Sequence, residues 1–278
     1  MVKIKQLHLE NYCGYRDMCF DFTDNGTFKP INLFFGPNGC GKSNALHALG
    51  ILSMSHRLST KVNDLYFRKM IYHEDYDPSY IKFESSNHSM RIEGIFDTDE
   101  GEKRVLITDQ GVEVNEIEKF SWGVVYFIDA DHPMNMQKFQ LHDELSDKFL
   151  DIAKLVYGFD CRLDQLCESF EKGDKEHYYK DFILDKKGTK VHFRRFSAGE
   201  RKIATLISAL CDPTYIKNID IITIDNLELH IYWKRHAAML DKLLEVFPDK
   251  QFICTTHSGT MIEHVREKYG KMCLYDLE

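Results

Sequence analysis

The sequence lacks several features that would place it in a specialised class. Its 278 residues contain no apolar run long enough to span a bilayer. Residues 1–5 alternate polar and apolar side chains and lack the apolar block of a signal peptide. The eight cysteines include no Cys-x-x-Cys pair, which argues against a zinc site and favours reduced, mostly buried thiols. We therefore expect a cytoplasmic protein with no membrane partner.

The chain also lacks an excess of positive charge. The chain has 36 Lys and Arg against 44 Asp and Glu, a formal net charge of −8, so a broadly basic surface for nucleic acid is excluded. The net charge does not exclude a local basic patch that binds nucleic acid. Hydrophobic residues make up 43% of the chain and charged residues 29%, which is ordinary for a globular protein. The length suits one large α/β domain with a sizeable core.

The first half of the chain predicts mainly strands. Residues 2–9 alternate as a strand does, 18–22 would be its hairpin partner, and 31–35 form a short apolar strand before a helix that begins near Ser43. Turn residues separate further strand-like segments, which predict an antiparallel sheet beside a nucleotide-binding core. These segments are 80–83, 90–96, 104–107 and 124–128.

The second half predicts an α/β alternation after a short insert. Residues 141–171 have a helical pattern, and 179–196 predict a hairpin that turns at Lys187-Gly188. Helices are then expected near 199–210, 231–246 and 258–268, and strands at 219–224, 251–255 and 272–275. We expect one domain, divided into an N-lobe (1–130), a small helical insert (131–178) and a C-lobe (179–278), with both lobes contributing to one sheet.

A P-loop follows the apolar strand at 31–35. Residues 36–43 have the pattern Gly-x-x-x-x-Gly-Lys-Ser, in which glycines let backbone N–H groups curl around phosphates and the next helix directs its positive end at them. The lysine would reach the β- and γ-phosphates, and the serine hydroxyl would bind Mg²⁺. The predicted ATP-binding residues are Gly36, Pro37, Asn38, Gly39, Cys40, Gly41, Lys42, Ser43 and Asn44.

A second metal ligand is predicted at the end of another apolar strand. Ile221-Ile222-Thr223-Ile224-Asp225 is typical of a Walker B strand, which presents its aspartate to the metal ion. Ser43 and Asp225 are therefore the expected Mg²⁺ ligands. The alternative is that Asp225 is only a turn residue after an ordinary strand. The presence of a P-loop in the same chain argues against this alternative.

The order of motifs resembles a known family. Residues 197–200 read Ser-Ala-Gly-Glu between the P-loop and the Walker B strand, and Thr-Thr-His-Ser follows at 255–258. This order resembles the ATPase heads of the ABC type, in the branch that includes the chromosome-maintenance (SMC) proteins, RecF and the OLD-like ATPases. Residues 4–12 and 20–22 also look like the opening strand pair of that branch. The resemblance implies an α/β P-loop fold: a mixed sheet, an antiparallel β subdomain and a small helical lobe.

The resemblance also implies how the site is completed. Heads of this family dimerise face to face around two ATP molecules, so the signature residues Ser197, Ala198, Gly199 and Glu200 would cap the γ-phosphate bound to the other subunit. His257 would be the switch histidine that touches the γ-phosphate. Ser197 with Glu200 three residues later also fits a capping box at a helix N-terminus, and the two interpretations are compatible.

The chain departs from the family directly after the Walker B aspartate. The family has a glutamate there that orients the attacking water, whereas this chain has Asn226, and an amide does not accept a proton as a carboxylate does. Glu228 matches the second acidic position of related heads and could substitute only if the loop bends. We therefore expect a weak ATPase whose catalytic set is Asp225, Asn226, Glu228 and His257. The alternative is that water is positioned in another way and the substitution is neutral.

Two further features of the family have no clear counterpart. The middle of the chain is too short for the long coiled coil of SMC proteins, and no sustained heptad repeat is present. A Q-loop glutamine should follow a strand before the helical lobe; Gln137 and Gln140 are candidates, and the alternative is that either is a solvated surface residue.

These observations favour an ATP-dependent dimerising module, most simply a homodimer, that works with a protein effector, a nuclease or DNA in repair or in defence against phage. Arg194, Arg195, Arg201 and Lys202 cluster near the signature, and they either contact DNA or form a solvated face. One alternative is the ATPase subunit of a membrane transporter, which the opening strand pair and the absence of a Leu-Ser-Gly-Gly-Gln signature disfavour. Another is a scaffold in which ATP is structural and is not turned over.

Overall fold

The computed structural model describes residues 1–53, 90–108, 111–114, 125–129, 143–168, 177–211 and 219–278. The predicted strand at 80–83 and both candidate Q-loop glutamines, Gln137 and Gln140, lie outside these residues. The described part contains no helix that combines the length and the apolarity needed to cross a membrane. It also contains no cluster of three or more His, Cys, Asp or Glu side chains suited to a metal ion.

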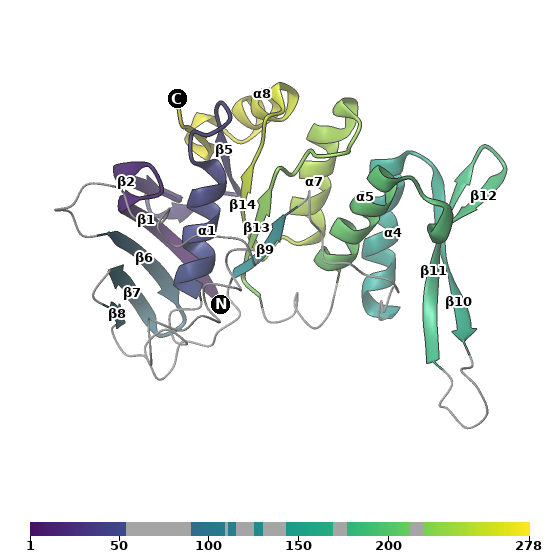
Figure 1. Ribbon diagram of the computed structural model, residues 1–278, viewed down its shortest axis with the longest axis horizontal. Coiled ribbons are helices and arrows are strands. Elements are labelled where there is room, and N and C mark those ends of the chain that lie inside the picture. Colours follow the sequence, from purple (N-terminus) through teal and green to yellow (C-terminus); the bar gives the residue numbers. More distant parts are fainter. Residues whose placement is uncertain (54–89, 109–110, 115–124, 130–142, 169–176, 212–218) are drawn as a thin grey trace.

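A parallel sheet of five strands forms the centre of the molecule (Figure 1). Its strands, in spatial order, are β15 (Leu274–Asp276), β5 (Ile31–Phe35), β14 (Gln251–Thr255), β13 (Ile221–Asp225) and β9 (Val125–Asp129). Every residue of β13 and β14 is buried, as expected for parallel strands that are covered on both faces. Since β5 and β9 come from the first half of the chain and the others from the second, the prediction that both lobes share one sheet is confirmed.

A second, antiparallel sheet has the order β2-β1-β6-β7-β8. Its strands are β1 (Val2–Tyr12), β2 (Tyr15–Asp21), β6 (Arg91–Thr98), β7 (Gly101–Thr108) and β8 (Gly111–Val114). The register between β1 and β6 shifts at Ile4 and Gln6, and this bulge lets both Ile4 and Leu7 face the core. A short ribbon of β3 (Thr23–Asp24) and β4 (Thr27–Phe28) follows β2.

The buried side chain of Gln251 joins the two sheets. Its amide nitrogen donates to the carbonyl oxygen of Ile4 at 2.9 Å, and its amide oxygen accepts from the backbone N–H of the same residue at 2.8 Å. An amide is one of the few side chains that can donate to and accept from one backbone residue at once. Gln251 thereby satisfies backbone groups at the point where the bulge interrupts the ladder of β1.

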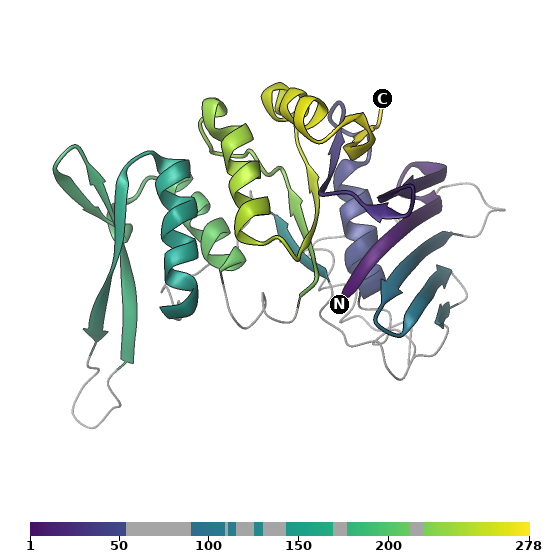
Figure 2. The same ribbon diagram turned by 180° about the vertical axis from the view of Figure 1, so that it is seen from behind.

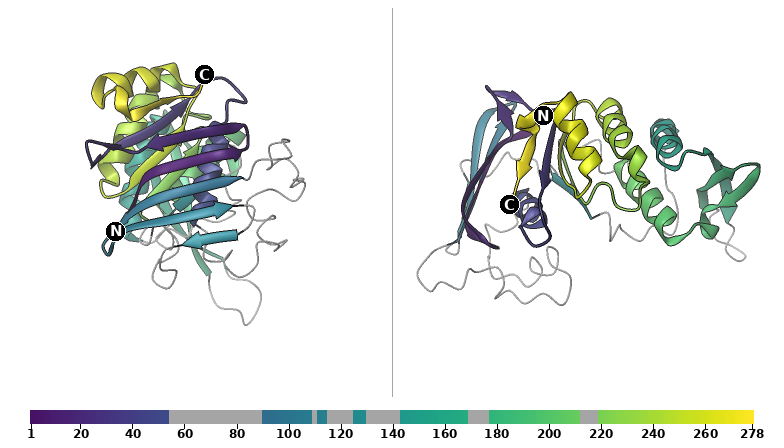
Figure 3. Two further views of the ribbon diagram at one scale, coloured as in Figure 1. Left: turned by 90° about the vertical axis from the view of Figure 1, so that its left-hand side faces the viewer. Right: turned by 90° about the horizontal axis from the view of Figure 1, so that it is seen from above.

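Helix α1 (Lys42–Ser53) lies between the two sheets, and helices cover the other face of the central sheet. Figure 3 shows these successive layers from above. Ala45, Leu46, Leu49 and Leu52 of α1 are fully buried in one hydrophobic cluster with residues of the antiparallel sheet. A second cluster on the opposite face involves α7 (His236–Val246), α8 (Gly259–Lys268), α4 (Asp143–Tyr157) and α5 (Ala198–Leu210).

A small sheet of three strands lies beyond α4 and α5, at the end of the molecule farthest from α1 (Figure 2). Its strands are β10 (Asp160–Glu168), β11 (His177–Lys186) and β12 (Thr189–His192), in that order. The predicted hairpin turn at Lys187-Gly188 is confirmed, because both residues have positive φ, at 56° and 86°, between β11 and β12. A single 3₁₀ turn (Phe193–Arg195) then leads to α5.

Two local predictions were wrong. Residues 141–171 are not one helix, because α4 ends at Tyr157, Gly158 takes a φ of 65°, and residues 160–168 pair along their whole length with β11. The strand predicted at 124–128 does not join the antiparallel sheet, since β9 pairs in parallel with β13 at the edge of the central sheet. In both cases long-range strand pairing, which local periodicity does not reveal, decides the structure.

Candidate nucleotide site

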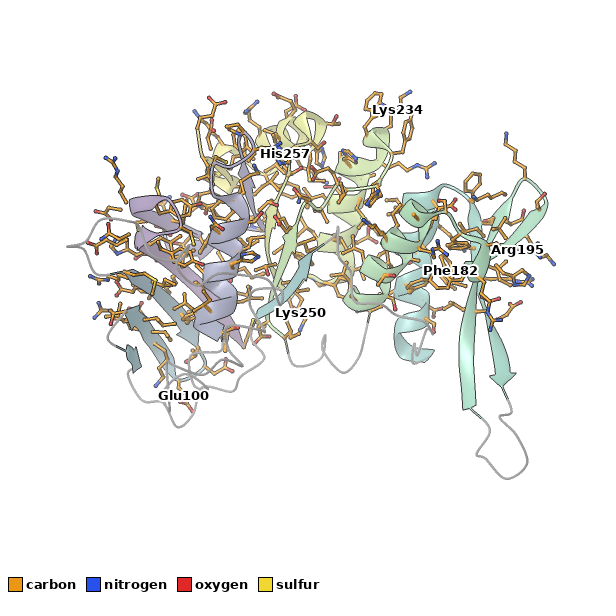
Figure 4. The ribbon with its side chains drawn as sticks, viewed as in Figure 1. Glu100, Phe182, Arg195, Lys234, Lys250 and His257 are labelled. Carbon is orange, nitrogen blue, oxygen red and sulfur yellow. The ribbon has the colours of Figure 1, made fainter. Side chains whose placement is uncertain are left out.

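Three loops meet at one edge of the central sheet because β5, β14 and β13 are adjacent and parallel. We call them the P-loop (36–43), the switch loop (256–258) and the Walker B loop (226–231), which follow those strands in that order. Figure 4 shows His257 at this edge and Lys250, which precedes β14, at the opposite one. The carboxyl edge of a parallel sheet is the usual place for a ligand in an open α/β fold. The chain thus brings its predicted phosphate, metal and switch residues to one place.

The P-loop has the backbone shape of a phosphate cradle. Gly36, Gly39 and Gly41 have φ values of 141°, 82° and 103°, a region that only glycine adopts at low cost. A Cβ at Gly41 would lie 2.8 Å from the hydroxyl oxygen of Tyr15, and one at Gly36 would lie 3.0 Å from Sγ of Cys40. The positive φ therefore requires glycine at all three positions, and neighbouring side chains leave no room for a Cβ at Gly41 and little at Gly36. Phosphate binding by backbone N–H groups needs the same open backbone.

Lys42 is buried at the start of α1, and its ammonium group lies within the loop. It donates to the carbonyl oxygens of Gly36 at 3.0 Å and Pro37 at 2.8 Å. Ser43 is the next residue of α1 and is half-buried. Three observations fit a nucleotide phosphate with Mg²⁺: the glycine cradle, a cation inside it, and hard oxygen donors on Ser43 and Asp225. The metal ion would supply charge neutralisation at the phosphates.

The turn between β1 and β2 supports the P-loop from outside. The hydroxyl of Tyr15 donates to the carbonyl oxygen of Gly41 at 2.9 Å, and the amide of Asn44 donates to the carbonyl oxygen of Cys13 at 3.1 Å. Burial raises the pKa of the Tyr15 hydroxyl, so this group keeps its proton and acts as a donor. Asn44, predicted to bind ATP, therefore also ties α1 to the first hairpin.

Thr255 organises the end of the Walker B strand. Its hydroxyl donates to Oδ1 of Asp225 and accepts from the backbone N–H of Asn226 at 2.8 Å. The backbone N–H of Leu227 donates to the Thr255 carbonyl oxygen at 3.2 Å. Asp225 is only 7% exposed, so these contacts hold one oxygen of a nearly buried carboxylate. This role of Thr255 could not be predicted from the sequence, because its contact with Asp225 depends on the parallel pairing of β13 and β14.

Asn226 is the first residue of the Walker B loop and has a φ of 55°. Asparagine tolerates this left-handed region better than most residues that carry a Cβ. Asn226 thus fits the backbone of the turn, at the position where the family resemblance implies a glutamate.

Glu228 turns towards the switch loop. Its Oε2 accepts from the hydroxyl of Thr256 at 2.6 Å, and its Oε1 accepts from the backbone N–H of His257 at 2.7 Å. His257 itself is exposed, whereas Thr256 and Ser258 on either side are buried. The switch loop therefore presents a single imidazole to solvent at the edge of the sheet.

The signature residues begin helix α5, and the predicted capping box is present. The Ser197 hydroxyl accepts from the backbone N–H of Glu200 at 3.3 Å, and the Glu200 carboxylate accepts from the backbone N–H of Ser197 at 2.9 Å. Lys186 of β11 forms an ion pair with Glu200, and Tyr157 of α4 donates to its carbonyl oxygen at 2.5 Å. Burial would raise the pKa of Glu200, but the bonds from Lys186 and Ser197 lower it below its usual range.

The signature is not next to the P-loop of its own chain. In Figure 1, α5 and α1 lie on opposite sides of β13 and β14. Ser197 and Ala198 are exposed at the helix N-terminus, and the nearest atoms to a Cβ built at Gly199 belong to His230, at 3.7 Å. The Walker B loop thus contacts the signature on one side and the switch loop on the other. Arg195 and Arg201 of the predicted basic cluster are exposed nearby.

Part of the sequence is similar to that of a known protein. The chain is similar to the retron Vc95 probable ATPase of Vibrio cholerae, with 28% identity over 101 residues, which are 33% of this chain and 20% of that protein. It therefore matches only about a fifth of that relative's length.

Two solved structures share the fold. The SMC head domain of Pyrococcus furiosus, bound to the C-terminal domain of ScpA, has a TM-score of 0.65 at 14% identity and matches 95% of this chain and 92% of that one. The recombination mediator protein RecF with ATP has a TM-score of 0.52 at 13% identity, over 93% and 95% of the two chains. The fold is therefore that of an SMC or RecF head. The family model described as the RecF/RecN/SMC N-terminal domain matches residues 3–274, and the chain belongs to this family of ATPases.

Proposed function

We propose that the chain is an ATP-dependent dimerising module that hydrolyses ATP slowly and acts with a protein effector, a nuclease or DNA. The observation that carries this proposal is the separation of the signature from the P-loop within one chain. The P-loop, Asp225 and His257 share one edge of the sheet, whereas Ser197 lies beyond α7 on α5. A second copy facing the first would place its Ser197 and Gly199 against the ATP of its partner.

In this proposal ATP controls assembly through a population shift. ATP binds a composite site more tightly than half of it, so nucleotide shifts the equilibrium from monomer to dimer. The exposed N-terminus of α5 suits this role, because its backbone N–H groups and helix dipole attract an anion. The capping box leaves Ser197 exposed, so its hydroxyl is accessible from outside the chain.

The test is the mass of the chain in solution, measured by light scattering with and without ATP and Mg²⁺. We expect wild type to become dimeric with ATP. Ser197→Arg should stay monomeric while its affinity for a fluorescent ATP analogue is unchanged, since Ser197 is remote from the P-loop of its own chain. Arg266→Ala on α8, away from the signature, is the matched control and should dimerise normally. A Ser197→Arg variant that dimerises as wild type does would refute the composite site.

Slow hydrolysis follows from Asn226, which cannot act as a general base. The chain would then use ATP mainly to hold an assembled state, with release of phosphate resetting it. Phosphate release measured under saturating ATP distinguishes a slow ATPase from a scaffold. Slow but measurable release supports the proposal, and the absence of any release would mean that the bound ATP is purely structural.

The partner in our proposal belongs to DNA metabolism, which the name of RecF as a recombination mediator supports, or to phage defence, which the resemblance of the motifs to the OLD-like branch implies. For DNA, we expect binding in the ATP state that weakens steeply with salt, through exposed groups such as Arg195 and Arg201. Binding that does not depend on salt or nucleotide would argue for a protein effector alone.

A further inference from the structure

Hydrogen bonds join the Walker B loop to the switch loop at two separate points. At the first point, the carboxylate of Glu228 accepts from the hydroxyl of Thr256 at 2.6 Å and from the backbone N–H of His257 at 2.7 Å. Each oxygen of the carboxylate thus receives one donor from the switch loop. The Thr256 hydroxyl in turn accepts from the backbone N–H of Ser258 at 3.0 Å, so one side chain fixes three successive residues.

The second point is the buried imidazole of His236. Its Nε2 lies 2.9 Å from the carbonyl oxygen of Ile231, and its Nδ1 lies 2.7 Å from the hydroxyl oxygen of Ser258. Because a carbonyl oxygen only accepts, Nε2 donates its proton to Ile231, and Nδ1 shares a hydrogen bond with the Ser258 hydroxyl. The same hydroxyl oxygen accepts from the backbone N–H of Met261 at 3.2 Å and so caps α8. The last residue of the Walker B loop is therefore tied to the last residue of the switch loop.

These contacts have a consequence for His257. Its backbone N–H is held by Glu228, the backbone N–H of Thr256 before it donates to the carbonyl oxygen of Phe34 at 3.0 Å, and the backbone N–H of Ser258 after it donates to the Thr256 hydroxyl at 3.0 Å. Its side chain is the exposed one, between two buried neighbours. A histidine whose backbone is fixed in this way has little freedom except rotation of its own side chain, which is what a group that must meet a phosphate requires.

The chemistry explains why residue 228 is acidic. Only a carboxylate offers an acceptor oxygen to each of two donors, whereas glutamine offers one oxygen and a nitrogen that donates. Hydrogen bonds to an ionised acceptor are also shorter and stronger than neutral ones. A general base would instead need a carboxylate oxygen turned towards the attacking water.

We propose that Glu228 is a positioning residue, which holds His257 towards the γ-phosphate, and that it does not act as the general base. This inference rests on the proposed function, since it assigns a role within the same ATP site. Glu228 stabilises the conformation of the switch loop, and of these two residues only His257 contacts the nucleotide.

The kinetic test compares Glu228→Ala with wild type and repeats the comparison in a His257→Ala background. We expect Glu228→Ala to lower kcat by about 10- to 100-fold, as misplacement of a group that contacts the reacting phosphate does. The affinity for a non-hydrolysable ATP analogue should change by less than about threefold, because the P-loop is intact. In the His257→Ala background the same change should have almost no further effect, since neighbours that act through one group are not additive.

Glu228→Gln separates positioning from base chemistry. A positioning role predicts a smaller loss than that of Glu228→Ala, because the amide oxygen still accepts one of the two donors. A base predicts a loss of about 10²–10⁴-fold for both variants that persists without His257. Glu245→Ala is the matched control, because this glutamate is 70% exposed and pairs with Lys242 on α7. Losses that add fully in the two backgrounds would overturn the proposal.

A second measurement does not depend on turnover. The backbone N–H of His257 donates to Glu228, so hydrogen exchange in the peptide that contains it should be faster in Glu228→Ala than in wild type. Equal exchange in both proteins would also overturn the proposal. A wild-type chain that binds no ATP would refute the proposed function instead, and the exchange measurement on the free chain would still decide the role of Glu228.

Discussion

If Asn226 makes hydrolysis slow, as we propose, replacing it by glutamate should raise the rate of ATP hydrolysis. Asn226 follows the Walker B aspartate, and its backbone N–H is anchored to the Thr255 hydroxyl at 2.8 Å. That anchor involves only the backbone of residue 226, so the new side chain should emerge from the same point. A correctly placed base contributes about 10²–10⁴-fold, or roughly 3–5 kcal/mol of barrier.

The substitution also has a conformational cost. Residue 226 has a φ of 55°, which asparagine tolerates and glutamate does less readily. We expect the variant to lose about 1 kcal/mol of folding stability, a tolerable part of the roughly 5–15 kcal/mol of a typical domain. Asn226→Gln is the matched control, because glutamine has the same side-chain length as glutamate and the same conformational cost at this φ but carries no carboxylate.

The assay is steady-state phosphate release at saturating ATP and Mg²⁺, at a protein concentration where the wild type is dimeric. We expect Asn226→Glu to exceed both wild type and Asn226→Gln by at least about tenfold, a conservative part of the range for general-base catalysis. Adding Ser197→Arg should abolish the gain if the site is composite. Equal rates for the glutamate, glutamine and wild-type proteins would refute the reasoning, because water would then be positioned by another group.

Three further predictions concern binding and stability. Lys42→Ala should reduce ATP affinity more than about tenfold in an equilibrium titration, with the fold retained in circular dichroism, because it removes the cation in the P-loop. Gln251→Ala should lower the free energy of unfolding in urea by about 2–4 kcal/mol, since it leaves both backbone groups of Ile4 without their partner. Asp249→Ala is the control and should have little effect, because Asp249 is exposed. Asp241→Asn should cost about 1 kcal/mol near neutral pH, because Asp241 accepts from His264 and pairs with Lys268 in a partly exposed site. Burial opposes the charge of Asp241, but these partners lower its pKa from 3.8 to about 2. Its contribution to folding stability is therefore present above pH 4. The difference in stability between the two proteins should vanish as the pH falls towards 2.

The sequence was most informative where local pattern and geometry coincide. Glycines at 36, 39 and 41 are required by backbone conformation, and the apolar strand before them and the helix after them are visible in the sequence. The capping box of Ser197 and Glu200 could likewise be predicted, because its two members are three residues apart. Each of these features depends on neighbours in the chain.

Features that depend on distant strands could not be predicted in the same way. The β-propensity of 125–129 is evident, but its place beside β13 is set by pairing with residues about a hundred positions away. The contacts of Tyr15 with Gly41 and of Glu228 with Thr256 arise for the same reason. From sequence spacing alone, Glu228 was still a candidate for the general base. Its hydrogen-bond partners in the structure favour a positioning role instead.

The roles proposed for Asn226 and Glu228 depend on each other. Glu228 is the only carboxylate in the Walker B loop, and both of its oxygens accept from the switch loop. If it holds His257, the loop has no second carboxylate to replace the missing base, so slow hydrolysis follows from the two residues together. The double variant Asn226→Glu with Glu228→Ala decides between these roles: we expect it to be slower than Asn226→Glu alone, because a restored base still needs His257 in place. If the double variant is as fast as Asn226→Glu, positioning by Glu228 contributes nothing to turnover.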